Sequence, residues 1–200
     1  ATTGAYANGS LPLSSFTTGT NPAAVVVNPA TNLLYVVNNS SNTITIFNAT
    51  TGAYVNGTLG ASSFTTGLNP WYLALNASAN LVYVANQSST SVTFFNATTG
   101  AYMNGTLGAS SFTTGAAPYK IAVNPTANLI YVTNYNSNTV TFFNATTGAY
   151  KNGTLANSSF ATGSQPMGVE VNPTANLLYV TNLISNTLSV FNATTGANAF

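Results

Sequence analysis

The sequence predicts an all-β protein in which one unit is repeated four times. The strand pattern Tyr-Val-x-Asn recurs every 48 residues, beginning at Tyr35, Tyr83, Tyr131 and Tyr179. Short β-branched and aromatic runs alternate with clusters of Asn, Pro, Gly and Ser, and no stretch has helical periodicity. A fixed period of this size is typical of propellers, solenoids and arrays. We therefore expect a β-propeller of four 48-residue, four-stranded blades.

Each repeat divides into four extended segments. In the first complete repeat we expect strands at 23–27, 33–37 and 43–47, and a fourth extended segment at 53–66. The first two strands are apolar on both faces, so they need cover on both sides. Stacking one four-stranded sheet on the next provides that cover.

The repeats indicate a single propeller domain over residues 1–200. Its blades are expected at about 20–67, 68–115, 116–163, and 164–200 plus 1–19. In this arrangement residues 1–19 supply the outer strand of the last blade, which closes the ring and removes two open edges. Two alternatives are half of an eight-bladed ring built from two chains, and an open array whose N-terminal segment donates a strand to a neighbour.

Charged residues make up only 2% of the chain, and they are Lys120, Lys151 and Glu170. Without a basic run there is nothing to neutralise phosphates or anionic lipid, which argues against nucleic acid and membrane surfaces as partners. The apolar stretches are far shorter than the roughly 18 residues of a membrane-spanning helix. Because His, Cys, Asp and Arg are absent, a carboxylate pair, a Ser-His-Asp triad and an ordinary metal site are excluded. This composition predicts no enzyme activity, no metal and no cofactor.

The repeat motif resembles a known family. The Tyr-Val-Thr-Asn copies at 131–134 and 179–182, their variants at 35–38 and 83–86, and the upstream Pro-x-x-Val-x-Val-Asn-Pro pattern are similar to YVTN-family β-propeller repeats. That family occurs in microbial cell-surface and surface-layer proteins. The resemblance covers all four repeats and implies an extracellular or cell-surface location. Repeats of that family are usually shorter than these, and their rings usually have more than four blades.

The aromatic and charged residues separate by whether they follow the repeat. Tyrosines and phenylalanines that recur in every blade are expected to pack in the core or between blades. Trp71, Tyr72 and Tyr119 break the pattern directly after the repeat's Pro, which makes them candidates for a ligand or subunit contact; local packing is the alternative. Lys120 and Glu170 occupy nearby positions in consecutive repeats. We expect an inter-blade ion pair near the axis, with a ligand-binding pair or separate solvation as alternatives.

Asn-x-Ser/Thr sequons recur at a turn and on the expected outer strand. Glycans there would block edge-to-edge strand pairing and solubilise a nearly uncharged surface. N-linked glycans are therefore predicted at some of the candidates Asn8, Asn48, Asn56, Asn96, Asn104, Asn144, Asn152 and Asn192. The alternative is that a repeated chain this rich in Asn, Thr and Ser contains such sequons by chance.

These features together predict an extracellular structural protein of the cell surface. Because a net charge near zero promotes association, we expect glycosylated chains that self-assemble into a fibre or surface layer. The main partner would then be a second copy of the chain, with glycans as further partners. The alternative is a lectin-like adhesion propeller that binds carbohydrate or protein.

Overall fold

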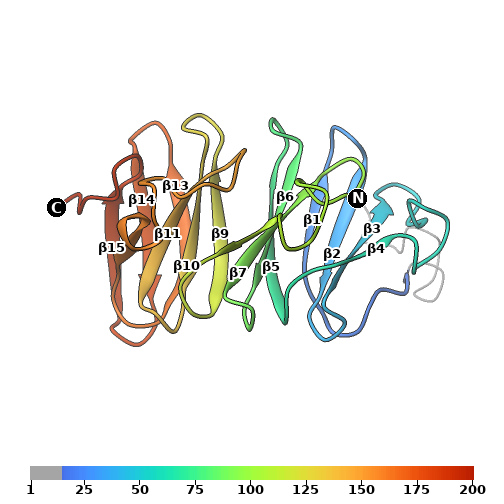
Figure 1. The fold of residues 1–200 in the computed structure, drawn as a ribbon, viewed down its shortest axis with the longest axis horizontal. Coiled ribbons are helices and arrows are strands. Elements are labelled where there is room, and N and C mark those ends of the chain that lie inside the picture. Colours follow the sequence, from blue (N-terminus) through green and yellow to red (C-terminus); the bar gives the residue numbers. More distant parts are fainter. Residues whose placement is uncertain (1–14) are drawn as a thin grey trace, which may run out of the picture.

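A computed structural model describes residues 15–200 and confirms four antiparallel sheets, which follow one another in sequence order from right to left in Figure 1. The first sheet comprises β1 (Pro22–Asn28), β2 (Leu33–Asn38), β3 (Thr43–Asn48) and β4 (Ser63–Thr65). The second comprises β5 (Pro70–Asn76), β6 (Leu81–Asn86), β7 (Ser91–Asn96) and β8 (Ser111–Thr113). The third comprises β9 (Pro118–Asn124), β10 (Leu129–Asn134), β11 (Thr139–Asn144) and β12 (Ser159–Ala161), preceded by the 3₁₀ turn η1 (Ala156–Ser158). The fourth comprises β13 (Pro166–Asn172), β14 (Leu177–Asn182) and β15 (Thr187–Asn192).

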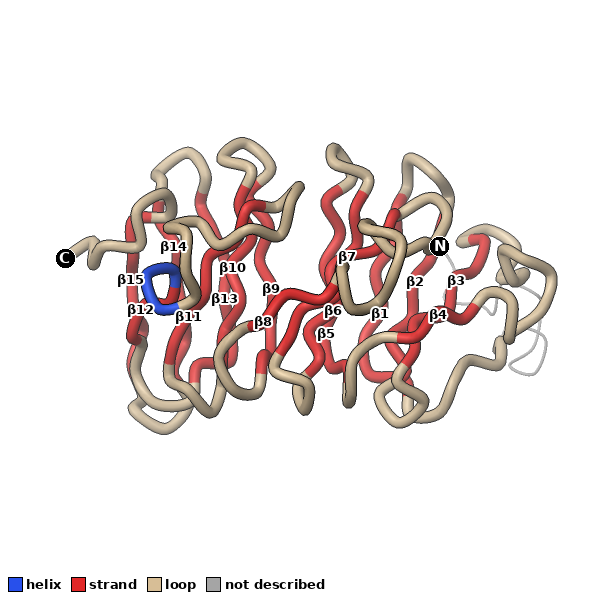
Figure 2. The backbone as a smooth tube through the Cα atoms, in the orientation of Figure 1, coloured by secondary structure: helices blue, strands red, loops and turns tan. Residues whose placement is uncertain are grey.

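Each sheet is a meander whose first strand lies innermost; Figure 2 traces the path of the backbone. Neighbouring blades meet mainly through these inner strands: β1 packs on β5, β5 on β9, and β9 on β13. The predicted propeller of 48-residue blades is thereby confirmed. The first three strands of the first blade agree with those expected to within one residue at each end, but the fourth extended segment expected at 53–66 is reduced to the three-residue β4 and an isolated bridge at Tyr54.

Asparagine side chains shape the turns between strands. Asn32 ends the first turn with φ of 56°, in the left-handed region that Asn tolerates better than most residues. Asn48 Oδ1 accepts hydrogen bonds from the backbone N–H groups of Thr50 and Thr51, at 3.0 and 2.9 Å. Both arrangements recur in the later blades, so the Asn-rich composition encodes turn geometry.

The Tyr-Val-x-Asn tyrosines join one blade to the next. Tyr83 Oη donates to the carbonyl oxygen of Ala145 in the following blade at 2.9 Å, and Tyr131 donates to Ala193 at 2.9 Å. Tyr35 makes the same bond to Ala97. All three tyrosines are fully buried, which confirms their predicted packing role.

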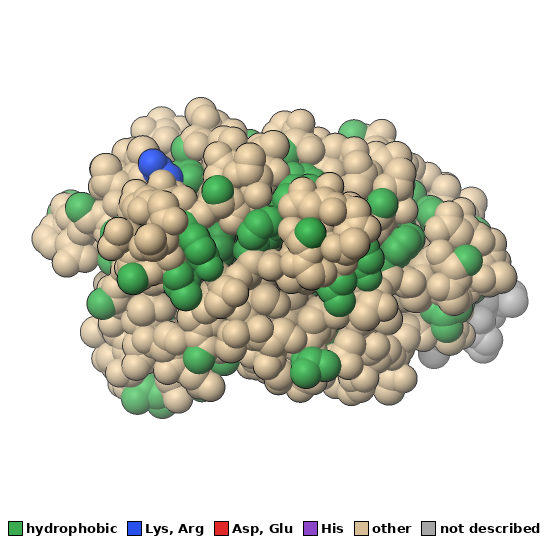
Figure 3. Space-filling model, in the orientation of Figure 1, with side chains coloured by type: hydrophobic (Ala, Val, Ile, Leu, Met, Phe, Trp, Pro, Cys, Tyr) green, Lys and Arg blue, Asp and Glu red, His purple; other side chains and the backbone are tan. Residues whose placement is uncertain are grey.

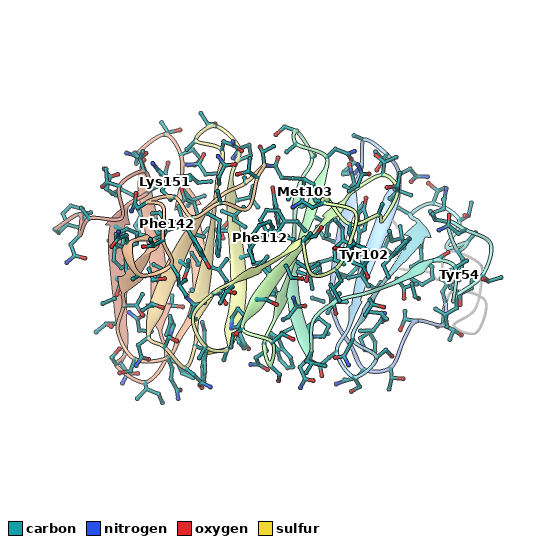
Figure 4. The ribbon with its side chains drawn as sticks, in the orientation of Figure 1. Tyr54, Tyr102, Met103, Phe112, Phe142 and Lys151 are labelled. Atoms are coloured by element: carbon teal, nitrogen blue, oxygen red, sulfur yellow. The ribbon has the colours of Figure 1, made fainter. Side chains whose placement is uncertain are left out.

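Recurring aromatic rings fill the outer part of each blade. Phe94 packs edge-on against Tyr83 at 4.6 Å and against Phe112 at 4.8 Å between ring centroids. Figure 4 shows Phe112 and Phe142 among the strands, and Tyr54 and Tyr102 on the loops that follow the third strands. Stacked sheets therefore cover both faces of the middle strands, as the apolar sequence of those strands required.

Replacing Tyr83 with Phe should cost about 1–3 kcal/mol, because the Ala145 carbonyl then stays buried without a donor. Burial raises the Tyr83 pKa to about 12. The phenol of the unfolded chain ionises near pH 10. The stabilisation that protonated Tyr83 gives the folded state is therefore complete below pH 10 and is lost as the pH rises through 12. Urea unfolding should show the two proteins converging above pH 10. An equal difference at pH 8 and pH 12 would contradict this role.

The fourth blade has no fourth strand among the described residues. Residues 15–18 lie against the first blade instead: Phe16 packs on Phe47 at 6.5 Å, and the Thr17 carbonyl accepts from Tyr54 Oη at 2.9 Å. Figure 1 places the first and fourth blades at opposite ends of the array. The expected closure of the last blade by residues 1–19 is thus not seen for residues 15–18, and residues 1–14 lie outside the described part. The two alternatives, half of an eight-bladed ring and an open array that donates a strand to a neighbour, remain predictions.

Candidate active site

The four inner strands surround one hollow of about 340 Å³, which we call the axial hollow. Aliphatic side chains form most of its wall, and its polar side chains are Tyr72 from β5 and Glu170 from β13. The residues that line it are Val25, Val26, Tyr72, Leu73, Ala74, Leu75, Ile121, Ala122, Val123, Glu170, Val171 and Pro173. Small-ligand sites usually have this composition, with apolar walls and a few polar groups that fix orientation.

A β-bulge in every inner strand controls which side chains face this hollow. In β5 the pairing with β6 shifts between Pro70 and Tyr72, which leaves Trp71 as the extra residue. A bulge of this kind redirects the side chains that follow it. Tyr72 accordingly lines the axial hollow, whereas Trp71 does not.

The charged residues of the inner strands gather around Tyr72. The Lys120 Nζ atom lies 5.8 Å from the centroid of the Tyr72 ring, a cation–π distance. Burial, and then the negative charge of Glu170, raise the pKa of the Tyr72 phenol, so it stays protonated at neutral pH. The Lys120 backbone N–H donates to buried Thr133 Oγ1 at 3.1 Å, which fixes this part of β9. The inter-blade ion pair of Lys120 with Glu170 remains a prediction.

A second cluster, the aromatic row, consists of Trp71, Tyr119 and Tyr135. Ring centroids are 5.9 Å apart between Trp71 and Tyr119 and 5.8 Å apart between Tyr119 and Tyr135. Tyr135 Oη also donates to Gln165 Oε1 at 2.6 Å. The structure thus brings Trp71 and Tyr119 together and separates both from the hollow that Tyr72 lines. Tyr135 was missed, although its departure from the repeat, where the other blades have Asn39, Gln87 and Leu183, was a visible signal.

The predicted glycosylation sites form two series in the structure. Asn56, Asn104 and Asn152 are exposed, and the Nδ2 of each donates to a backbone carbonyl at 2.8 Å. The turn series is half-buried, with Oδ1 atoms engaged by backbone N–H groups; its members are Asn48, Asn96, Asn144 and Asn192. Asn8 lies outside the described residues. Modification of any of these sites remains a prediction.

The face in Figure 3 carries a band of hydrophobic side chains across the middle of the array, with mainly backbone and other side chains on both sides. Within residues 15–200, no three His, Cys, Asp or Glu residues come together as a metal site. In the same part of the chain, every helix is too short to cross a bilayer.

A sequence profile for the family described as "Lactonase, 7-bladed beta-propeller" matches residues 7–104 and, overlapping them, 59–153. The chain belongs to this family. No curated protein sequence is significantly similar to it.

Solved structures resemble this lactonase-family chain in fold. Hydrazine synthase of Kuenenia stuttgartiensis superposes with a TM-score of 0.75 at 17% identity, covering 92% of this chain and 49% of the other. A 6-phosphogluconolactonase-like protein of Bacteroides fragilis gives 0.66 at 20%, covering 89% and 52%. A protein of unknown function from Desulfotomaculum acetoxidans gives 0.67 at 19%, covering 90% and 57%. The chain therefore spans about half the length of these structures.

These findings correct the functional predictions. The propeller implied by the YVTN resemblance is confirmed, but the family match is to lactonases and gives no support to the surface-layer type. The prediction of a structural or adhesive surface protein without enzyme activity is wrong, because this chain matches an enzyme family. The error was chemical: the absence of His and Cys excludes triads, but opening a lactone requires only one base and one hydrogen-bond donor. An extracellular location, glycans and self-association remain predictions.

Proposed function

We propose that this chain hydrolyses small, uncharged lactones in the axial hollow. One observation carries the proposal: Glu170, the only carboxylate side chain in the sequence, lines the same hollow as Tyr72, with Lys120 against the Tyr72 ring. Two of only three charged side chains thus lie at the centre of the propeller, in a chain of the lactonase family. Charged groups concentrated in a concave site of an otherwise neutral protein indicate a functional role.

The reaction needs a base, an oxyanion donor and a proton for the leaving oxygen. The Glu170 carboxylate takes a proton from water as the water oxygen bonds to the lactone carbonyl carbon. The Tyr72 hydroxyl donates a hydrogen bond to the oxygen on which negative charge develops. When the ring C–O bond breaks, the proton held by Glu170 passes to the ring oxygen. The product is the open hydroxy acid, and the carboxylate is regenerated.

Two features of Tyr72 and Lys120 suit this role. The raised pKa of Tyr72 keeps its hydroxyl a neutral hydrogen-bond donor at neutral pH. The Lys120 ammonium adds a positive charge beside the phenol, which favours the oxyanion and the product carboxylate over the neutral substrate. The three side chains therefore have complementary tasks, although none belongs to a catalytic triad.

The substrate class follows from the walls and charges of the hollow. Its lining is largely aliphatic, and its volume of about 340 Å³ is at the small end for a ligand site. A phosphorylated lactone would require several cations or a bidentate arginine, and this chain has two lysines and no arginine. We therefore propose an uncharged lactone, in contrast to the phosphorylated sugar lactone in the name of the B. fragilis neighbour.

The experiment is a pH-stat assay that records acid release from a panel of uncharged γ- and δ-lactones and from their phosphorylated counterparts. The purified chain should accelerate ring opening of at least one uncharged member, with a phosphorylated counterpart at least tenfold slower. Rates equal to buffer for every lactone would refute the proposed activity. Faster turnover of the phosphorylated members would refute the proposed substrate class.

A further inference from the structure

The aromatic row stands at positions where the propeller does not need aromatic rings. The position of Trp71 and Tyr119 is taken by Ala23 in the first blade and by Met167 in the fourth, and those inner strands form the same bulge. Trp71 is 37% exposed, so its indole is not part of the core. The rings of the row are therefore available for a contact that the fold itself does not supply.

The row begins beside the proposed catalytic residues. Trp71 directly precedes Tyr72 on β5, and Tyr119 directly precedes Lys120 on β9. Consecutive Cα atoms are about 3.8 Å apart. Because Tyr72 lines the axial hollow and Trp71 does not, the row starts one residue outside the wall of the hollow. A lactone whose carbonyl group faces Tyr72 therefore has the row within reach of a short substituent.

The other end of the row is open and polar. Tyr135 lines a second hollow of about 550 Å³, whose wall also contains the carboxamides of Gln87 and Asn136. The Tyr135 ring is held in place from the fourth blade, because its hydroxyl donates to Gln165 Oε1 at 2.6 Å. The row is thus a fixed apolar surface that leads from the axial hollow to this polar space.

The chemistry of the row selects a neutral aromatic occupant. Its three rings are uncharged, and the single carboxylate side chain of the sequence, Glu170, lines the axial hollow instead. Neither a cation nor an anion would therefore find a partner of opposite charge within the row. An aromatic group gains offset-stacked or edge-on contacts with such rings in addition to the area that it buries, and an aliphatic group does not.

We propose that the aromatic row is a substrate subsite that holds an aryl substituent of the lactone opened in the axial hollow, an inference that rests on the proposed function. The aryl group lies against Trp71 and Tyr119, while the lactone carbonyl faces Tyr72 and Glu170. Because the substituent is bound before and during the reaction alike, this contact lowers KM more than it raises kcat. The row therefore sets which lactones the chain prefers.

Trp71 is the only tryptophan of the chain, so its fluorescence reports on the row without any turnover. The probe is 3-benzylcyclopentanone, which has the shape of γ-benzyl-γ-butyrolactone but no ring C–O bond to open. We expect a saturable blue shift of the emission, because the benzyl ring replaces water at an exposed indole. The cyclohexylmethyl analogue should bind at least about threefold more weakly. No shift would overturn the subsite, and equal binding of the two ketones would overturn its preference for an aryl group.

Two variants locate the binding surface while keeping Trp71 as the reporter. Tyr119→Ala should weaken binding of 3-benzylcyclopentanone about two- to tenfold. Met167→Ala is the matched control, because it truncates the side chain at the same position of the repeat in the fourth blade, outside the row. It should bind the ketone as the unmodified chain does. Both side chains are half-buried, and urea unfolding checks that both variants fold. Equal weakening in the two variants would contradict the proposal.

The pH-stat assay separates failure of the subsite from failure of the proposed function. The unmodified chain should prefer γ-benzyl-γ-butyrolactone over γ-butyrolactone at least about threefold in kcat/KM, mainly through KM. Trp71→Ala should reduce this preference, and Met167→Ala should keep it. Hydrolysis of both lactones at equal kcat/KM would overturn the subsite and leave the proposed activity intact. Binding of the ketone without turnover of any lactone would instead refute the hydrolysis.

Discussion

Replacing Glu170 with Gln should lower kcat/KM for an uncharged lactone by at least about 100-fold, because the amide cannot accept the proton of the attacking water. The substitution removes no packing, since Glu170 is exposed and Gln has nearly the same shape. KM should change little if binding depends mainly on the aliphatic walls of the axial hollow. Initial rates from the pH-stat assay measure both constants.

Lys151→Gln is the matched control for this variant. It also removes one of the three charges, but from an exposed residue, labelled in Figure 4, that does not line the axial hollow. Its rate should equal that of the unmodified chain. If Glu170→Gln keeps full activity, Glu170 is not the base, and the proposed mechanism is wrong.

Replacing Gly148 with Ala should destabilise the fold by about 2–4 kcal/mol. Gly148 has a φ of 71°, and a Cβ built there would lie 2.2 Å from the Phe112 ring of the preceding blade. That ring cannot move freely, because it also packs against Phe94. The free-energy cost of the left-handed backbone and the cost of the clash therefore add in this one substitution. Urea unfolding measures their sum.

Gly153→Ala separates the two contributions. Gly153 has a similar φ of 83°, but nothing lies within 4 Å of a Cβ at this position. The variant should lose only about 1–2 kcal/mol from the backbone strain. Equal losses for the two variants would contradict the clash, because they would mean that the Phe112 ring moves aside for the added methyl group at no cost.

The sequence predicted the fold well because the fold depends on local signals that are repeated four times. Asn32 and its equivalents mark turns, and the Tyr35 series marks blade contacts, at one fixed period. Each of these positions has the same residue type in every repeat. The first three strands of a blade could therefore be predicted within a residue of those observed, whereas the outer strand, expected at 53–66, is only Ser63–Thr65.

The site was only partly predictable, because it depends on where the repeats differ and on how inner strands bend. Lys120, Glu170 and Tyr72 were identified from the sequence as exceptions, but the bulge that separates Tyr72 from Trp71 has no unique signature. The sequence likewise could not decide between a closed and an open array. Residues 15–18 occupy the same position of the repeat whether they complete a blade of their own ring or a blade of another ring. The match to an enzyme family was not predictable from residue types alone, because the absence of His and Cys excludes catalytic triads but not a reaction that needs one base and one hydrogen-bond donor.

The most direct test of the central claim is a crystal structure of the Glu170→Gln variant soaked with a slowly reacting uncharged lactone. We predict an intact lactone in the axial hollow, with its carbonyl oxygen within hydrogen-bond distance of Tyr72 Oη and its carbonyl carbon facing the substituted side chain on β13. A lactone bound only elsewhere, such as on the aromatic row of Trp71, Tyr119 and Tyr135, with the axial hollow empty would contradict the account.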